Sequence, residues 1–307
     1  MKKITRREFL KFGAGMLAIS LVPKFISGGE NKSEKAGPII AVATGNKTKL
    51  VKPALDLIGG IGAFVKQGDR VLLKPNISFA SNSEWGATTS VNIVKQITEL
   101  CLSAGASKII ILDYTIQNAE LCTKNSSIMD TQIDKKVSIL TPDKERQFVE
   151  VNVPNGQELK KVKISRELQK VDKLINIPTA KSHSATGVSL GIKNLMGLVW
   201  DRAYFHKVNI HLAVAELLKV IKPDLTIVDA TRALTSGGPG GPGKTVILNT
   251  VIAGIDPVAV DSYTVGITPW YDKSFRGKDV KYIVEASKLG FGEIETDNMN
   301  IRKVDVE

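Results

Sequence analysis

Continuous apolar runs rich in β-branched residues alternate with amphipathic segments along most of the chain. The apolar runs predict strands at residues 39–45, 70–76, 107–113, 171–180, 225–230 and 245–256. Apolar residues at helical spacing predict helices at residues 88–106, 211–222, 257–266 and 277–289. Strands that are apolar on both sides and separated by helices are typical of a mostly parallel sheet with helices on both faces. The pattern therefore predicts an α/β fold.

Breaks in this pattern predict the domain organisation. Residues 28–37 (GGENKSEKAG) are polar and glycine-rich, which is typical of a linker. No second linker and no repeat follow, so we expect residues 38–307 to form one α/β domain. The stretch 120–168 is more polar and irregular, and we expect a small antiparallel insertion or cap there.

The N-terminus has the pattern of a twin-arginine export signal, assigned to residues 1–27. TRREFLK at 5–11 is followed by the apolar run FGAGMLAISLV at 12–22, which is too short for a stable membrane span. We therefore expect the twin-arginine export machinery as a partner. The predicted location is across the cytoplasmic membrane, in the periplasm or on the outer face of the cytoplasmic membrane, with tethering by an uncleaved signal as the alternative. This route carries proteins that fold before export, often around a cofactor.

The charge balance narrows the classes of partner. The formal net charge is +11, of which residues 1–27 contribute six basic residues and one acidic residue. The remaining +6 is mildly basic and is compatible with an anionic ligand or an anionic surface. No Lys/Arg stripe is interleaved with aromatic residues, so nucleic acid is not an expected partner.

The cysteine content limits the cofactors. Cys101 and Cys122 are the two cysteines, and neither belongs to a C-x-x-C pair. We therefore expect no iron–sulfur cluster and no structural zinc from this chain alone. Cys101 falls on the apolar face of helix 88–106 and is expected to be buried, although an exported protein can also pair it with Cys122.

Polar residues follow the predicted strands where each strand ends. In open α/β sheets the ligand crevice lies outside the carboxyl ends of the strands. The residues in such positions are Lys74, Asn76, Asp113, Lys181, His183, Asp229 and Asp256. They predict one polar site, although Asp256 before Pro257 also fits a helix cap.

Two local motifs suggest other chemistries. GPGGPGKT at 238–245 matches a phosphate-binding loop in letters, but β-branched residues typical of a strand follow it. We expect instead a glycine-rich loop beside the site or a surface hairpin, with Gly240 and Lys244 as candidate anion contacts. GVSLG at 187–191 matches a nucleophile elbow, but no histidine follows Asp229, so a serine hydrolase is not predicted.

The segment KSHSATGVSLGIKN, residues 181–194, is the expected centre of the site. The predicted catalytic residues are His183, Lys181 and Asp229, because imidazole, amine and carboxylate groups transfer protons. The predicted substrate-binding residues are Lys74, Asn76, Lys193, Asn194, Gly240 and Lys244. A divalent metal is a candidate cofactor, with His183, Asp229 and Asp256 as its ligands.

Several segments together resemble the family called domain of unknown function 362. They are VLLKPN (71–76), GATTS (86–90), INIPTAKSHSATGVSLGIKNLMGLV (175–199), LTIVDA (225–230), the loop 238–243 and AGIDPVAVDS (253–262). Several members of that family carry ferredoxin-like cysteine clusters, which this chain lacks. The resemblance implies that any redox role needs a redox partner protein or another cofactor, and it implies no reaction.

Two functional hypotheses result. The first is an exported α/β enzyme that acts on a small anionic molecule. The second is a non-catalytic carrier that holds a metal or cofactor for a redox system of the cell envelope. The sequence does not decide between them.

Overall fold

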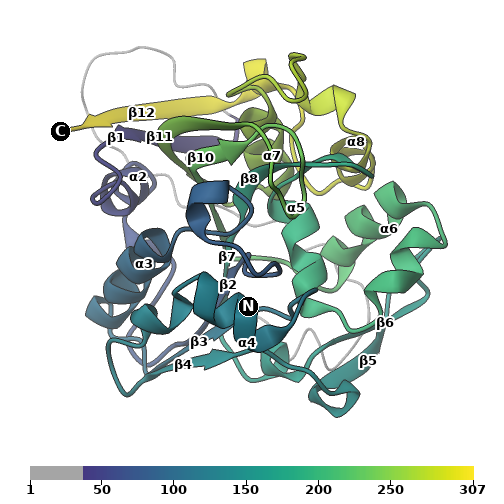
Figure 1. Cartoon of the computed structure of the whole chain (residues 1–307), viewed down its shortest axis with the longest axis horizontal. Coiled ribbons are helices and arrows are strands. Elements are labelled where there is room, and N and C mark those ends of the chain that lie inside the picture. The colour runs from purple at the N-terminus through teal and green to yellow at the C-terminus, as the bar shows by residue number, and fades with distance from the viewer. Residues whose placement is uncertain (1–36) are drawn as a thin grey trace, which may run out of the picture.

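The computed structural model describes residues 37–307, which form a mixed, mostly parallel sheet between helices (Figure 1). Eight strands cross the sheet in the order β12 (Asn300–Val306), β1 (Ile39–Gly45), β11 (Thr245–Gly254), β10 (Leu225–Leu234), β7 (Lys173–Ile177), β2 (Arg70–Pro75), β3 (Lys108–Leu112) and β4 (Val137–Leu140). Two more strands join beside β10, namely β8 (Thr179–His183) and β9 (Gly187–Ser189). The predicted α/β fold is confirmed.

Helices cover both faces of the sheet, as the apolar pattern predicts. The described helices are α2 (Val51–Asp56), α3 (Val91–Ser103), α4 (Ala119–Asn125), α5 (Gly191–Asn194), α6 (Ile210–Glu216), α7 (Pro257–Val265) and α8 (Lys281–Lys288). In β2, Val71 and Leu73 pack in the same core as α2 and α3, whereas Leu72 packs in the core of α5 to α8. Successive strand residues therefore fill two separate cores, since their side chains alternate between the faces.

Two strands run against the parallel direction, namely β11 and the short β9, which pairs antiparallel with β8. β11 pairs antiparallel with both β1 and β10, and residues 235–244 connect β10 to β11 as a long hairpin. The C-terminal strand β12 pairs in parallel with β1 at the edge of the sheet (Figure 1). The apolar pattern does not predict β12, because NIRKVDV alternates with charged residues as an edge strand does.

The irregular stretch 120–168 contains the expected antiparallel element. β5 (Phe148–Asn152) and β6 (Lys161–Ser165) form a separate two-stranded antiparallel sheet. β4, in the same stretch, belongs to the main sheet, where it pairs in parallel with β3. The insertion is therefore shorter than the sequence predicts.

Cys101 and Cys122 are both buried free thiols. Cys101 lies in the core beneath α3, as its place on the apolar helix face predicts. The disulfide that the sequence left open is not formed. In the part of the chain from residue 37 onward, no helix has the length and apolar character needed to cross a membrane. The predicted signal and most of the predicted linker lie outside the described residues.

Candidate functional site

A pocket of about 420 Å³ opens at the carboxyl ends of β2, β3 and β8. This volume is in the range of sites for small organic ligands. Five residues predicted from strand ends and the following helix line it, namely Asn76, Lys181, His183, Lys193 and Asn194. Residues that sequence reasoning did not assign to the site also line it, including Phe79, Tyr114, Trp200, Arg202 and His206.

A buried polar network forms the base of the pocket. The Nζ atom of Lys74 lies 2.8 Å from Asp113 Oδ1, and both side chains are fully buried. Asn194 connects the strand ends of this network. Its Nδ2 donates to the Lys74 carbonyl at 3.1 Å and to Asn176 Oδ1 at 2.9 Å. Its Oδ1 accepts from Asn76 Nδ2 at 3.1 Å. Lys74 is therefore paired behind the lining rather than exposed to a ligand, and it supports Asn194.

Lys181 is a buried amine at the wall of the pocket. Its Nζ donates to Asn76 Oδ1 at 3.0 Å and to the Ala87 carbonyl at 2.7 Å, and it lies 4.7 Å from the centre of the Phe79 ring. Burial lowers the pKa of Lys181 to about 7; the other two lysines of the site also lower it, and Asp113 opposes the shift. Near neutral pH, Lys181 can therefore both give and accept a proton.

Lys193 carries a buried charge with a weak partner. Its Nζ donates to the Met196 sulfur at 3.4 Å, and a thioether is a poor acceptor. Within residues 37–307 no carboxylate lies within ion-pair distance of this ammonium. Burial, and then the charge of Arg202, lowers the pKa of Lys193 to about 8. At neutral pH the group is a cation that lacks an anion.

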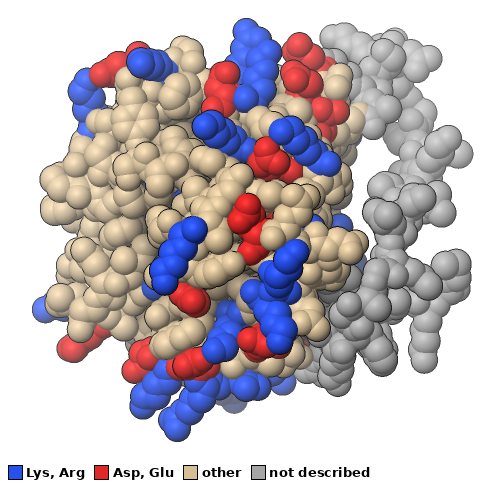
Figure 2. Space-filling model, turned by 90° about the vertical axis from the view of Figure 1, so that its right-hand side faces the viewer, with Lys and Arg blue, Asp and Glu red and all other residues tan. Residues whose placement is uncertain are grey.

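Arg202 adds a second cation of the same kind. Its two terminal nitrogens donate to the carbonyls of Tyr114 at 2.6 Å and Thr115 at 2.7 Å, and its guanidinium lies 4.0 Å from the centre of the Tyr114 ring. No ion pair to Arg202 forms among the described residues. Figure 2 shows, by contrast, that Lys and Arg lie beside Asp and Glu on the outer face in view. Lys193 and Arg202 are therefore two pocket cations that form no ion pair with the described residues.

His183 is neutral, and a backbone hydrogen bond fixes the orientation of its ring. The Ala185 N–H donates to its Nδ1 at 3.1 Å, so the ring hydrogen of the neutral form is on Nε2. Burial, followed by the charges of Lys193 and Lys181, lowers the pKa of His183 to about 3. His183 therefore offers an N–H donor to a ligand without titrating at neutral pH.

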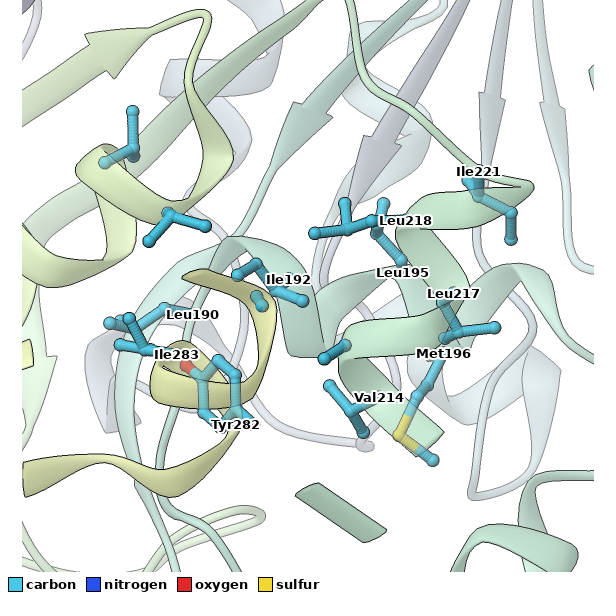
Figure 3. Packing of buried hydrophobic residues seen from close by; sticks show 14 of the residues in the cluster. Leu190, Ile192, Leu195, Met196, Val214, Leu217, Leu218, Ile221, Tyr282 and Ile283 are labelled. Carbon is cyan, nitrogen blue, oxygen red and sulfur yellow. The ribbon is translucent and has the colours of Figure 1, made fainter. Parts of the chain in front are cut away.

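Helix α5, which carries Lys193 and Asn194, is held from below by Asp261. The Asp261 carboxylate accepts from the N–H groups of Gly191 at 2.7 Å and Ile192 at 3.0 Å. A Cβ atom at Gly191 would lie 2.7 Å from Asp261 Oδ1, so the close approach requires glycine. The apolar side of this segment packs against α6 and α8 (Figure 3). Sequence reasoning did not select Asp261, although it belongs to the family-like string AGIDPVAVDS.

Replacing Asp261 by Asn is expected to remove a pH-dependent part of the stability. Burial raises the pKa of Asp261 from 3.8 to about 7, so the folded protein binds this proton more tightly than the unfolded chain. The stabilisation from this group is complete below about pH 4 and is lost as the pH rises to 7. Unfolding free energies of the wild type and D261N should therefore diverge in favour of the variant from pH 4 to 8. A difference that stays constant with pH would contradict the assignment.

The structure does not bring the three candidate metal ligands together. Asp229 accepts from the Ser90 N–H at 2.7 Å and from Thr231, and it is not part of the pocket lining. Asp256 caps α7 and accepts from three backbone N–H groups, which matches the capping alternative. No group of three or more His, Cys, Asp or Glu able to hold a metal occurs in residues 37–307.

The physical reason for the position of Asp229 is the length of β10. This strand continues to Leu234, so Asp229 lies within it rather than at its end. Asp229 points to the same face as Ile227, which packs in the core of α2 and α3. Its carboxylate is used to hold the start of α3.

The glycine-rich loop lies beside the pocket. Pro239 lines the pocket, the Gly238 N–H donates to Ser182 Oγ at 3.0 Å, and Gly240 packs against the Phe79 ring. Lys244 is exposed and forms an ion pair with Asp272 at 2.7 Å, so it does not reach the pocket. β11 begins directly after the loop and no helix follows, so the geometry is not that of a nucleotide-binding loop.

Ser189, the serine of the GVSLG string, is the last residue of β9 and lines the pocket. Within the described part of the chain, no hydrogen bond connects Ser189 to a histidine. The serine therefore lacks the activated arrangement of a hydrolase nucleophile in this structure.

Comparison with known proteins places the chain in a family. Residues 71–266 match the family described as Domain of unknown function (DUF362). A relative is the thylakoid-associated protein sll1697 of Synechocystis sp. (strain ATCC 27184 / PCC 6803 / Kazusa), which is 27% identical over 217 residues. That match covers 68% of this chain and 64% of the relative.

Proposed function

Because the chain belongs to the DUF362 family, whose name states no reaction, we propose its function from the pocket itself: it binds a small anionic molecule and transfers protons to or from it. The observation that carries this proposal is the buried ammonium of Lys193, whose partner is a thioether sulfur. A buried charge is costly without a counter-charge, so an anion bound in the pocket would stabilise it.

The other groups of the pocket support an anionic ligand. Arg202 presents a second cation, and neutral His183 presents an N–H donor. Asn76 adds an amide group, which Asn194 and the base of the pocket hold in place. Charge-assisted hydrogen bonds from such a set are stronger than neutral ones.

Lys181 supports the catalytic part of the proposal. Its pKa of about 7 suits general acid–base catalysis, which is most efficient when the pKa lies near the working pH. The amine lines the same pocket as Lys193, so a bound anion would lie next to it. The predicted role of Asp229 is not part of this proposal, because that side chain holds α3.

Calorimetric titration of the full chain with inorganic phosphate, pyruvate and phenylpyruvate tests the proposal. We expect saturable binding of at least one of these anions at one site, and a higher melting temperature when it is bound. Lys244→Met is the matched control, because Lys244 is an exposed lysine outside the pocket. Absence of saturable binding with all three anions would overturn the proposal. A loss of binding in Lys244→Met as large as the loss in Lys193→Met would also overturn it.

We also propose that the chain is exported by the twin-arginine route and works at a membrane-bounded compartment. The motif TRREFLK and the apolar run after it support this proposal, as does the name of the relative, which places that protein with the thylakoid.

Replacing Arg6 and Arg7 together by lysine is expected to block export. The twin-arginine machinery reads the arginine pair, and lysine keeps the charge but loses the planar guanidinium. The measurement is the fraction of the protein outside the cytoplasmic membrane after cell fractionation. Replacing Lys2 and Lys3 by arginine serves as the control and should leave this fraction unchanged. Export of the double lysine variant at the wild-type level would contradict the signal.

A further inference from the structure

The hydrogen bonds of Lys181 match a neutral amine. An ammonium group has three N–H donors, whereas a neutral amine has two donors and one lone pair. Lys181 Nζ has two hydrogen-bond acceptors, Asn76 Oδ1 and the Ala87 carbonyl, and both are uncharged. Among the described residues, no carboxylate forms an ion pair with it. With both hydrogens directed into the protein, the lone pair is left for the pocket that Lys181 lines.

The surroundings of the amine favour the same form. Lys181 is almost completely buried, and the ammonium groups of Lys74 and Lys193 lie near enough to lower its pKa. Lys74 is already neutralised by Asp113, whereas Lys193 is not. The Phe79 ring favours a cation, but burial and like charge oppose it. A desolvated lysine beside another cation is the arrangement that activates lysine as a nucleophile.

We propose that Lys181 is a nucleophile that forms an imine with the carbonyl carbon of a small 2-oxo acid. This inference rests on the proposed function, because Lys193 and Arg202 would bind the carboxylate of the acid while its carbonyl group meets Lys181. A 2-oxo acid carries both groups on adjacent carbons, so it meets both requirements of the pocket. Unlike inorganic phosphate, it also offers a carbon skeleton that can lie against Phe79 and Trp200, which line the same cavity.

The step needs no reagent beyond the two reactants. The lone pair of Nζ attacks the carbonyl carbon, and a carbon–nitrogen bond forms. The carbon–oxygen bond then breaks, and the oxygen leaves as water with the two hydrogens of the amine. Protonation of the imine from solvent restores one N–H, for which Asn76 Oδ1 is the nearby acceptor. The resulting cation withdraws electrons from the neighbouring carbon, which prepares a proton transfer there.

Trapping by reduction tests the imine. The full chain is incubated with pyruvate or with phenylpyruvate in the presence of cyanoborohydride, and the intact mass and the peptide map are measured. We expect one reduced adduct per chain, located on Lys181 by the peptide map of the wild type. Lys181→Arg should lose this adduct, whereas Lys244→Arg, which changes an exposed lysine, should keep it.

The outcomes separate this inference from the proposed function. If pyruvate or phenylpyruvate binds in calorimetry but neither gives an adduct on Lys181, the imine is overturned and anion binding stands. An adduct spread over exposed lysines, and unchanged in Lys181→Arg, overturns it equally. If inorganic phosphate and both oxo acids fail to bind and no adduct forms, the proposed function and the imine are overturned together.

Discussion

Replacing Lys193 by Met should make the protein more stable and weaken its binding of anions. The wild type buries this ammonium against a thioether sulfur, so the free protein bears the cost of desolvating the charge. Burial lowers the pKa of Lys193 from 10.5 to about 8, which disfavours the charged form in the folded state at neutral pH. Removing the charge and keeping an apolar chain of similar length should raise the free energy of unfolding by about 1–3 kcal/mol.

The same substitution removes the cation that meets the ligand. Losing one partner of a buried charge pair costs about 2–5 kcal/mol, which corresponds to an affinity lower by between about 30-fold and a few thousand-fold. Calorimetry with phosphate or pyruvate and chemical unfolding measure the two effects on one preparation. Opposite signs for stability and binding distinguish a binding residue from a core residue, whose loss would lower both.

The pH dependence of anion binding provides a second test of the role of Lys193. Binding requires the ammonium form, so the affinity of the wild type should fall as the pH rises through about 8, where Lys193 loses its proton. The Lys193→Met variant should lack that part of the profile. Lys244→Met, which changes an exposed pair, should alter stability by less than about 1 kcal/mol. A Lys193→Met protein that binds like the wild type would remove the main support for the anion site.

The apolar pattern predicts most of the fold, because strands buried on both faces have a strong signal. The observed strands differ from the predicted ones where local backbone chemistry or pairing with another strand sets the strand boundary. Pro178 divides the predicted strand 171–180 into β7 and β8, since proline cannot donate to the sheet. The hairpin with β11 extends β10 past Asp229 and turns a predicted strand end into a strand interior.

Part of the site can also be predicted from the sequence. Strand ends of one sheet share an edge, so Asn76, Lys181 and His183 could be expected to lie close together, and the structure places them around one pocket. Arg202 does not lie at a strand end, so this rule does not predict its position in the pocket. It lies in the segment after α5, and the carbonyls of Tyr114 and Thr115 hold it at the pocket. Backbone contacts between distant segments leave no pattern in one sequence.

Replacing Asp113 by Asn is expected to be the most destabilising of the changes considered. The Asp113 carboxylate meets Lys74 at 2.8 Å and accepts from the Ile77 N–H at 2.8 Å and from Ser78 Oγ at 3.0 Å. Breaking a buried pair leaves the other charge unpaired and costs about 3–5 kcal/mol, which for a domain of this size lowers the melting temperature by roughly 10 °C.

Three variants separate this pair from ordinary surface charge. The exposed pair Lys52–Asp56, at 2.7 Å, supplies the control: Asp56→Asn should cost less than about 1 kcal/mol. Adding Lys74→Met to Asp113→Asn should recover part of the lost stability, because no unpaired charge then remains in the core. Equal costs for Asp113→Asn and Asp56→Asn would show that the buried pair does not support the pocket. The expected large cost would instead mean that the pocket's base is a rigid, charged part of the core, able to hold Asn194 and the cations above it in place before a ligand arrives.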